Sequence, residues 1–502
     1  MNRRIILQAL AGLLLCASGY FVSHRESYDV HTVLATAGGC QMATDIYEPR
    51  SGTPLGSVVL FHGLAANKKV MTFSAQEFSN QDLRVFVPDL PGHGRTAGPF
   101  SPDRADACAL ALVRELAARR AILPERTILA GHSLGGAIAL RAASHFPVAG
   151  VIAISPAPMR IAPGFSAEMI PFHDVPALPA RSLVLTGQWE PGAIKSLAQQ
   201  LVSSSADASS KYQMITGATH VSILFSSKTF SELRSWTSQL LATNPGAPFP
   251  QNMPALGCIF GIIGLSILAP PFLREMNPPP AAPSARLAFA PDYHIALLTF
   301  AIASISTAAA LSFTFVPLHF VHVFQGGYLG VFLFLTGIIA LVFRYKSVRS
   351  LRFLPTAPVL SSLASAILLA LLFAAWCELT FYEAWLSPAR WLRFLLLALL
   401  LLPAHLAEEL LLGETKTSPN FPRLLKALLL RSVVYLALLL GIFVLHSGAV
   451  LLFLLLAYFV VFSVLQRLAC DLVRFTTRSS AAAAVFGAIL LAAFALAVFP
   501  IA

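Results

Sequence analysis

The sequence is poor in charge. Only 12% of its 502 residues are charged and 56% are hydrophobic, whereas an average soluble chain has about 25% charged and about 45–50% apolar residues. This composition excludes an ordinary soluble globular protein. The length also exceeds that of one usual domain, so we expect at least two units, with the apolar excess confined to part of the chain.

Paired cysteines are also missing. The six cysteines include no CxxC pair, so their spacing supports neither a zinc site nor a dithiol redox centre. We therefore predict no metal and no cofactor. Only Cys40 and Cys108 fall in the more polar part of the chain. A disulfide between them requires an oxidising compartment, and we favour two buried thiols instead.

The sequence has no basic cluster with polar or aromatic neighbours. A net charge of +11 can indicate nucleic-acid binding when the basic residues gather on a soluble face. Here they lie between long apolar runs, so nucleic acid is excluded as the expected partner. Membrane lipids are the partners that we expect, and the sequence names no protein partner.

Long apolar runs dominate the rest of the chain. Residues 5–22 follow Arg3 and Arg4, as in a signal anchor or a cleavable signal peptide. Eight further runs have the length needed to cross about 30 Å of hydrocarbon at 1.5 Å per residue. We predict these spans at 254–273, 295–316, 327–343, 357–376, 393–412, 430–446, 448–466 and 480–500.

The predicted loops differ in basic residues, which favour the cytoplasmic side. If the N-terminus is cytoplasmic, the outer loops hold only Arg390 and Arg393. The inner loops then hold Arg274, Arg286, Arg344, Lys346, Arg349, Arg352, Lys416, Arg423, Lys426, Arg431, Arg467, Arg474 and Arg478. We therefore expect a multi-pass protein of a bacterial inner membrane, with residues 23–252 on the exported, periplasmic side.

The exported part has the pattern of an α/β domain. Short β-rich runs alternate with helical stretches at 105–121 and 134–144, which predicts a mostly parallel sheet with helices on both faces. The expected strands are 58–61, 85–87, 127–130, 151–154, 183–185 and 212–215. The predicted domain organisation is a signal anchor or signal peptide at 1–22, an α/β domain at 23–242, a linker at 243–253, and an all-α membrane domain of about eight helices at 254–502.

A serine follows the expected strand at 127–130. It stands in Gly131-His132-Ser133-Leu134-Gly135, where glycines permit the sharp strand-to-helix turn that exposes a nucleophilic hydroxyl. The pattern alone is weak, and its position between a strand and a helix strengthens it. The alternative is a non-catalytic serine that is only part of the turn.

A serine nucleophile needs a base and an acid that orients the base. His220 follows the expected strand at 212–215, and Glu190 follows the expected strand at 183–185. The resulting order along the chain is serine, acid, histidine, which is the order found in parallel α/β folds that carry a serine at such a turn. His220 alternatively caps or fills the core. Oxyanion donors are expected from the backbone N–H groups of Leu134 and Leu64.

The acid has three rivals. Asp207 and Asp174 lie in the same part of the chain as Glu190, and Asp89 also follows a strand but precedes the serine. Because the acid of this fold comes after the nucleophile, Asp89 is the weaker candidate. Trp189, next to Glu190, is interpreted as a packing or pocket residue.

Together these segments resemble the α/β-hydrolase superfamily. The resemblance covers about residues 28–242 and rests on LFHGL, VPDLPGHG, GHSLGG, the acid position and GATH. Within the superfamily the chain looks most like serine aminopeptidases and monoacylglycerol lipase-like esterases. It departs from them in having Glu190 where most carry Asp, and in a short segment between Met159 and Arg181 where many carry a helical cap.

The predicted fifth span of the membrane domain contains ionisable residues. His405, Glu408 and Glu409 share one helical side. Such groups at membrane depth indicate a functional site, but we favour acids that reach the headgroup layer from the cytoplasmic end.

Two function classes follow. The first is a membrane-tethered serine hydrolase (carboxylesterase or lipase-like, or a peptidase) that cleaves an ester or amide of a small or lipid-like substrate through an acyl-enzyme. The second is a transporter or lipid-handling acyltransferase-like protein whose hydrolase-like domain binds or modifies cargo.

Overall fold

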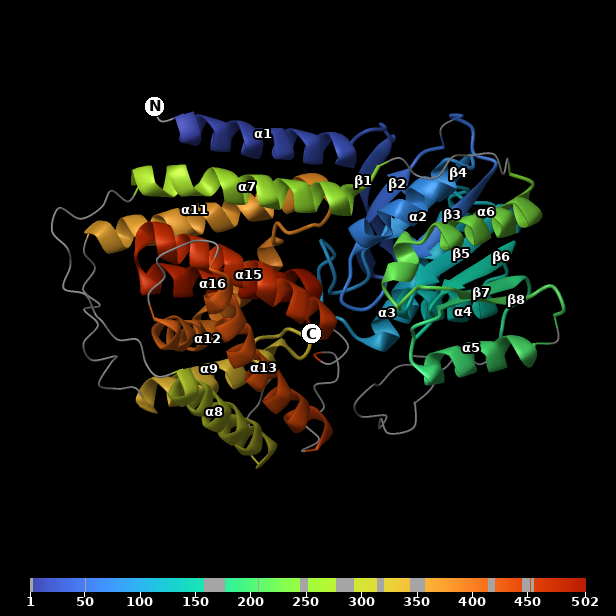
Figure 1. The fold of residues 1–502 in the computed structure, drawn as a ribbon. Helices are drawn as coiled ribbons and strands as arrows, with labels where there is room; N and C mark the ends of the chain where they lie inside the picture. Colours follow the sequence, from blue (N-terminus) through green and yellow to red (C-terminus); the bar gives the residue numbers. More distant parts are fainter. Residues whose placement is uncertain are drawn as a thin grey trace. The chain divides into compact units, whose positions relative to one another are not determined.

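The protein is described by a computed structural model that divides into two compact units (Figure 1). The sheet unit comprises Val22–Ala255, Phe381–Glu383 and Ala497–Ala502, and the helical unit comprises Met1–Phe21, Leu256–Thr380 and Ala384–Leu496. The structure describes residues 3–49, 51–157, 177–205, 207–243, 252–276, 293–313, 320–343, 357–413, 420–444, 452 and 456–502.

The sheet unit is built on one eight-stranded sheet with strand order β1-β2-β4-β3-β5-β6-β7-β8. From β4 through β8 the neighbouring strands are parallel, whereas β2 pairs antiparallel with both β1 and β4. The strands are β1 Val30–Ala37, β2 Cys40–Tyr47, β3 Gly56–Phe61, β4 Leu83–Pro88, β5 Thr127–His132, β6 Gly150–Ile154, β7 Ser182–Gly187 and β8 Lys211–Ile215. The predicted mostly parallel sheet is confirmed.

The six predicted strands correspond to β3 through β8, but β1 and β2 were not predicted. Strand β1 lies at the sheet edge and is largely exposed. It therefore lacks the continuous apolar run that marks a buried parallel strand.

Helices cover both faces of the sheet. Alternate residues of a strand point to opposite faces, and Val58 and Leu60 of β3 share one core with Phe73 of α2 and Phe230 of α6. Helices α3 and α4 contact each other, and α4 packs on β3, β5 and β6 at the other face (Figure 1). The helices are α2 Thr72–Ser79, α3 Pro102–Ala118, α4 Leu134–His145, α5 Gly192–Ser203 and α6 Ser227–Leu241, with short 3₁₀ turns at Lys68–Met71, Pro124–Arg126 and Ser222–Phe225.

Helix α3 begins earlier than its predicted start at residue 105. Pro102 occupies the first turn, and the side chain of Ser101 accepts a hydrogen bond from the backbone N–H of Arg104. A serine cap followed by proline is a strong start signal. The apolar period alone placed the start three residues too late.

Helix α3 is also linked covalently to β2. Cys40 and Cys108 form a disulfide, with 5.7 Å between their Cα atoms. Our expectation of two free thiols was wrong, because the fold brings residues 68 positions apart within bonding range.

The helical unit consists of long apolar helices. The described helices are α1 Arg3–Ser23, α7 Pro254–Met276, α8 Tyr293–Phe313, α9 Gly326–Phe343, α11 Ala357–Thr380, α12 Pro388–Leu412, α13 Phe421–Phe443, α15 Leu456–Thr477 and α16 Ser480–Val498. Within the described residues, eight of them are long and apolar enough to cross a membrane, and α15 is not among these eight.

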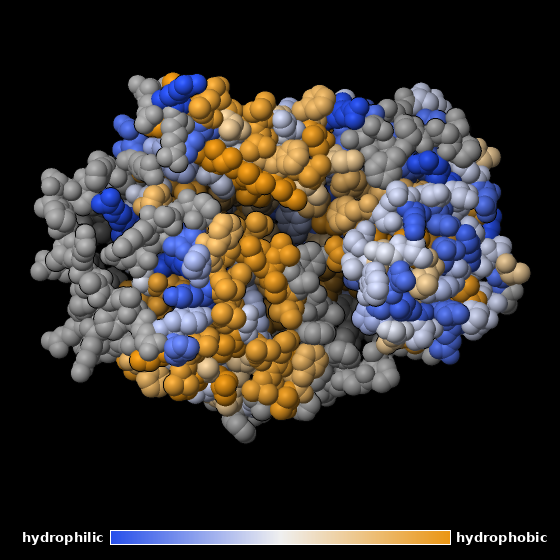
Figure 2. Space-filling view, viewed as in Figure 1, coloured by the Kyte–Doolittle hydropathy of each residue, from blue (hydrophilic) through white to orange (hydrophobic). Residues whose placement is uncertain are grey.

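Large apolar side chains cover the outside of these helices. Leu14, Leu392, Leu399 and Leu436 are each at least 65% exposed. Figure 2 shows hydrophobic residues gathered on the drawn surface of the helices and hydrophilic residues on that of the sheet unit. Helices that are apolar on the outside as well as the inside are typical of membrane spans.

Glycines allow close packing at two places in the helical unit. A Cβ on Gly337 of α9 would lie 2.2 Å from the backbone nitrogen of Ala404 in α12. A Cβ on Gly487 of α16 would lie 2.5 Å from His405 Cδ2. The small residues therefore set the spacing of α12 from two neighbours, as in other tightly packed membrane helices.

Several charges differ from their predicted positions. Arg423, Lys426 and Arg431 lie in α13, and Arg467 and Arg474 lie in α15, so none of the five is a loop residue. Their predicted loop positions were wrong because these helices extend past the apolar runs. Buried acids compensate the buried arginines.

The acids of α12 also differ from our expectation. Glu408 is 5% exposed and Glu409 is 2% exposed, and both pair with arginines inside the helical unit. Our expectation that these two acids extend to the headgroup layer was therefore wrong. Most of the predicted short cap segment, Asp174 and most of the predicted linker lie outside the described residues.

Candidate active site

Ser133 stands between β5 and α4 in a strained backbone conformation. Its φ is 53° and its ψ is −120°, and it is the residue just before the first turn of α4. A non-glycine residue with positive φ is uncommon. The turn is held by a hydrogen bond from the Ser133 N–H to the carbonyl of Ile154, at the end of β6.

The glycines around Ser133 make room for this turn. A Cβ on Gly131 would lie 2.2 Å from the carbonyl oxygen of Gly135, and a Cβ on Gly135 would lie 2.3 Å from that of Phe61. Both distances are far below van der Waals contact, so no larger residue fits without moving the backbone. The predicted need for glycine follows from close packing on β3 and β5.

His220 lies in the loop after β8, next to Ser133. Its Nε2 is 3.0 Å from Ser133 Oγ, within hydrogen-bond range. The imidazole can therefore accept the hydroxyl proton. These two predicted residues, 87 positions apart, are brought together.

Glu190 lies behind His220, in the loop after β7. Its Oε2 is 3.7 Å from His220 Nδ1, and within the described residues neither atom has a hydrogen-bond partner. Its Oε1 accepts hydrogen bonds from the N–H of Gly187 and from Ser155 Oγ. A small closure would bring the buried carboxylate into hydrogen-bond range of the histidine, and such bonds often tighten only with substrate.

The rival acids have other partners. Asp89 accepts hydrogen bonds from Lys68 and from the backbone N–H of Arg95. Asp207 accepts from the N–H of Arg181 and from Ser209; the Arg181 bond is the largest cause that lowers the pKa of Asp207 to about 2. Of the described candidates, Glu190 faces His220.

His132, directly before Ser133, was not predicted to have a role at the site. Its Nε2 is 2.7 Å from the carbonyl oxygen of His220 and donates to it, which fixes the position of the loop that carries His220. Burial, and then the nearby His220, lower the pKa of His132 to about 3, so the ring is neutral at physiological pH. Ser155, the other unpredicted residue, holds the Glu190 carboxylate.

The predicted oxyanion donors belong to two backbone segments beside Ser133. Leu134 begins α4, where the first N–H groups of a helix have no acceptor within it. Leu64 follows Gly63, whose Cβ would be 3.1 Å from Ser133 Cβ. The loop that carries Leu64 therefore lies against the nucleophile.

Buried polar side chains hold the Leu64 loop. The N–H of Leu90 donates to His62 Nε2, so His62 Nδ1 carries the proton and donates to the Gly63 carbonyl. Burial lowers the pKa of His62 and keeps it neutral. The imidazole therefore ties this loop to the segment after β4.

Lys68 continues the same loop and is fully buried. Its Nζ is 2.7 Å from Asp89 Oδ2, and it also pairs with Glu383. Burial alone would lower the pKa of Lys68, but the two carboxylates raise it above its usual value. The lysine is therefore charged, and its ion pairs with Asp89 and Glu383 hold the Leu64 loop in place.

The arrangement suits acyl transfer. A hydroxyl, a base that contacts it and a buried acid behind the base are the parts of a serine nucleophile. Among the described residues, no group of three or more His, Cys, Asp or Glu side chains is placed to hold a metal ion.

Part of the chain is similar in sequence to a known esterase. Over 114 residues the chain is 33% identical to a pimeloyl-(acyl-carrier protein) methyl ester esterase from Edwardsiella ictaluri, which covers 22% of this chain. The match spans 39% of that relative, about two fifths of its length.

Part of the chain is also similar to solved structures of hydrolases. A predicted CIB-like hydrolase from Thermoplasma acidophilum is 20% identical, with a TM-score of 0.33, over 43% of this chain and 100% of the other. An α/β serine hydrolase without lid from Xanthomonas campestris is 18% identical, with a TM-score of 0.33, over 43% and 94%.

The family assignment rests on the sequence match. Residues 58–257 match the sequence model of the alpha/beta hydrolase family, and this range holds β3 through β8, the serine turn and His220. This part of the chain, about two fifths of its length, is therefore an α/β-hydrolase domain by its fold and by sequence similarity.

Proposed function

We propose that the protein is a membrane-inserted serine hydrolase that cleaves an ester, or an amide, of a small or lipid-like substrate. The Ser133 hydroxyl attacks the substrate carbonyl carbon while His220 Nε2 takes its proton. The leaving alcohol or amine departs with that proton, and an acyl-enzyme remains. Water then attacks the acyl carbon by the reverse proton path, releases the acid and regenerates Ser133.

One observation carries the proposal: the hydrogen bond between His220 Nε2 and Ser133 Oγ at a strained, glycine-flanked turn. Glu190 stabilises the imidazolium that forms on His220. The N–H groups of Leu134 and Leu64 stabilise the oxyanion of the tetrahedral intermediate. The esterase activity named for the Edwardsiella ictaluri relative supports the ester class.

The membrane assignment is supported by the eight long apolar helices found within the described part of the chain. We assign residues 1–22 to a signal anchor, 23–242 to the hydrolase domain, 243–253 to a linker and 254–502 to the membrane domain. We place the hydrolase domain on the exported side, because the Cys40–Cys108 disulfide requires an oxidising compartment.

A second candidate function is transport or lipid handling, with the hydrolase domain modifying cargo. The buried ion pairs of Glu408 and Glu409 in the helical unit favour it, because anchoring alone needs no charges there. Catalytic loss in Ser133→Ala without loss of transport would favour this alternative.

The first test is labelling by a fluorophosphonate probe, which reacts with activated serines. Membranes that contain the full chain should be labelled, and Ser133→Ala and His220→Ala should each abolish labelling. Ser204→Ala, at an exposed serine, should label normally. A folded, membrane-inserted chain that resists the probe, or that labels equally after Ser133→Ala, would contradict the proposal.

A further inference from the structure

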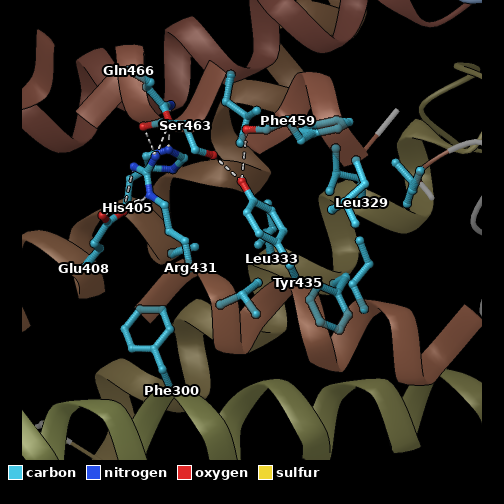
Figure 3. A pocket seen from close by; sticks show the side chains of 17 residues that line it. Phe300, Leu329, Leu333, His405, Glu408, Arg431, Tyr435, Phe459, Ser463 and Gln466 are labelled. Atoms are coloured by element: carbon cyan, nitrogen blue, oxygen red, sulfur yellow. Dashed lines mark hydrogen bonds and ion pairs between the residues drawn. The ribbon is translucent and has the colours of Figure 1, made fainter. Parts of the chain in front are cut away.

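The helical unit contains a partly open cavity of about 70 Å³. A water molecule needs about 10–15 Å³ measured in this way, so the space can hold a larger group. Most of the wall is apolar and includes Phe300, Leu329, Leu333 and Phe459. Figure 3 shows polar side chains gathered on one side of it, which gives the cavity two chemically different ends.

Three helices supply the polar end. Each helix contributes two polar residues, which are three or four positions apart in the sequence and therefore lie on the same face of the helix. They are His405 and Glu408 of α12, Arg431 and Tyr435 of α13, and Ser463 and Gln466 of α15.

The charges at this end compensate each other. Glu408 pairs with Arg431 and Arg467, and Glu409 and Asp471 pair with Arg423 and Arg467. These are three acids and three arginines. An occupant with its own net charge would therefore be uncompensated in a low-dielectric site.

His405 adds no charge. Its Nε2 accepts a hydrogen bond from the Gln466 amide, and its Nδ1 donates to the Leu401 carbonyl. The amide orientation is fixed because Gln466 Oε1 accepts from Arg431. The ring therefore carries one proton and is neutral.

Hydrogen-bonding capacity remains at this end. Arg431 has five N–H donors; in the described contacts four of them go to Glu408, the Ser463 carbonyl and Gln466. The Tyr435 hydroxyl donates to the Phe459 carbonyl and therefore accepts from Ser463 Oγ, and both hydroxyl oxygens keep a lone pair that can accept a further hydrogen bond. One donor and several acceptors are thus available, which suits a group that both donates and accepts.

We propose that this cavity binds one uncharged long-chain alcohol, with its hydroxyl at Arg431, Tyr435 and Ser463 and its chain against Leu329 and Leu333. A hydroxyl both donates and accepts hydrogen bonds, brings no charge, and can be followed directly by apolar methylenes. A mostly apolar cavity with a few convergent polar groups is the usual form of a small-molecule site. This binding does not depend on Ser133 or on hydrolysis.

The test uses photoreactive hexadecanol that carries a diazirine and an alkyne. The purified full chain with Ser133→Ala, in phospholipid nanodiscs, is irradiated with the probe, and the labelled peptides are mapped by mass spectrometry. We expect labels on α9, α13 and α15. Unlabelled hexadecanol should compete at least ten times better than hexadecyl sulfate, hexadecyltrimethylammonium or hexadecyl methyl ether, because these bring a charge or lack the donor.

Variants locate the site. Leu333→Trp fills the cavity and should reduce labelling at least fivefold, whereas Val342→Trp, at an exposed position of the same helix, should leave it unchanged. Tyr435→Phe should weaken the preference for the alcohol over its methyl ether. Ser432→Ala, at an exposed serine of α13, is the matched control.

Three results would overturn the inference. They are labels spread evenly over the outer helix surfaces, equal competition by the charged amphiphiles, or normal labelling of a folded Leu333→Trp chain. If Leu333→Trp does not fold, competition on the parent chain and the Tyr435→Phe variant still decide. Because every sample contains Ser133→Ala, failure here says nothing against the proposed hydrolase.

Discussion

At the scale of single side chains, Glu190 shows how a carboxylate can be held in place before it contacts its histidine. One oxygen is fixed by Gly187 and Ser155, and the other faces His220 across 3.7 Å. Glutamate is one methylene longer than the usual aspartate. Its Oε1 is held by residues from two neighbouring strand ends, Gly187 at the end of β7 and Ser155 directly after β6.

Glu190→Gln should therefore impair catalysis without unfolding the domain. The amide can keep the contacts at Oε1 but cannot stabilise the imidazolium, so kcat/KM for an activated ester should fall by about 10³–10⁴. Asp207→Asn is the control and should stay within twofold of the parent. A normal rate after Glu190→Gln would remove the acid from the proposed triad.

His132 predicts a specific dependence of stability on pH. Its pKa falls from 6.5 to about 3 in the folded chain, so between these values the unfolded chain binds one more proton. The free energy of unfolding should therefore decrease as the pH falls through this window, by at most about 1.4 kcal/mol per pH unit from this residue.

His132→Gln keeps a donor for the His220 carbonyl but cannot titrate. Thermal unfolding of the purified chain, followed from pH 7 to pH 4, should lose less stability with acid in this variant than in the parent. Parallel pH profiles for the two proteins would show that His132 does not make this contribution.

At the scale of elements, the junction of β5 and α4 depends on glycine, because a larger residue at position 131 or 135 would meet the backbone. Gly135→Ala puts a methyl group 2.3 Å from the Phe61 carbonyl. The variant should lose fluorophosphonate labelling and at least about 1–3 kcal/mol of stability. Gly192→Ala, at the start of α5, meets nothing within 4 Å and should be neutral or slightly stabilising. Normal labelling of Gly135→Ala would contradict this account.

The same elements explain what sequence analysis could and could not predict. Strands β3 through β7 and the serine turn carry local signals, because buried parallel strands are continuous apolar runs and tight turns need glycine. The exposed edge strand β1 has no such run. His132 and Ser155 act through contacts with residues far away in the sequence, which no local pattern records.

The charges of α13 and α15 were misplaced for a related reason. An arginine beside an apolar run is compatible with a loop or with a buried ion pair, and the acids that decide between them belong to other helices. Arg423, for example, pairs with Glu409 of α12 and Asp471 of α15. All three residues are visible in the sequence, but only the folded structure shows that they form ion pairs.

At the scale of the whole molecule, the disulfide predicts the compartment of the sheet unit. Chain from cell membranes, denatured without reduction and treated with a maleimide polymer, should gain two further adducts after reduction. Cys40→Ser with Cys108→Ser should abolish this difference. Equal numbers of adducts before and after reduction would show that both thiols are free, and would remove the support for export.

Residues 497–502 belong to the sheet unit although the apolar helices precede them in the sequence, and this affects the timing of biosynthesis. The N–H of Ile501 donates to the Gly92 carbonyl, and the N–H of Phe100 donates to the Ile501 carbonyl. Residue 501 leaves the ribosome 260 residues after Leu241, the last residue of α6, which takes on the order of tens of seconds at about 5–20 residues per second. Until residue 501 is synthesised, the segment after β4 lacks this backbone partner, so the sheet unit can be completed only after the intervening apolar helices have been translated.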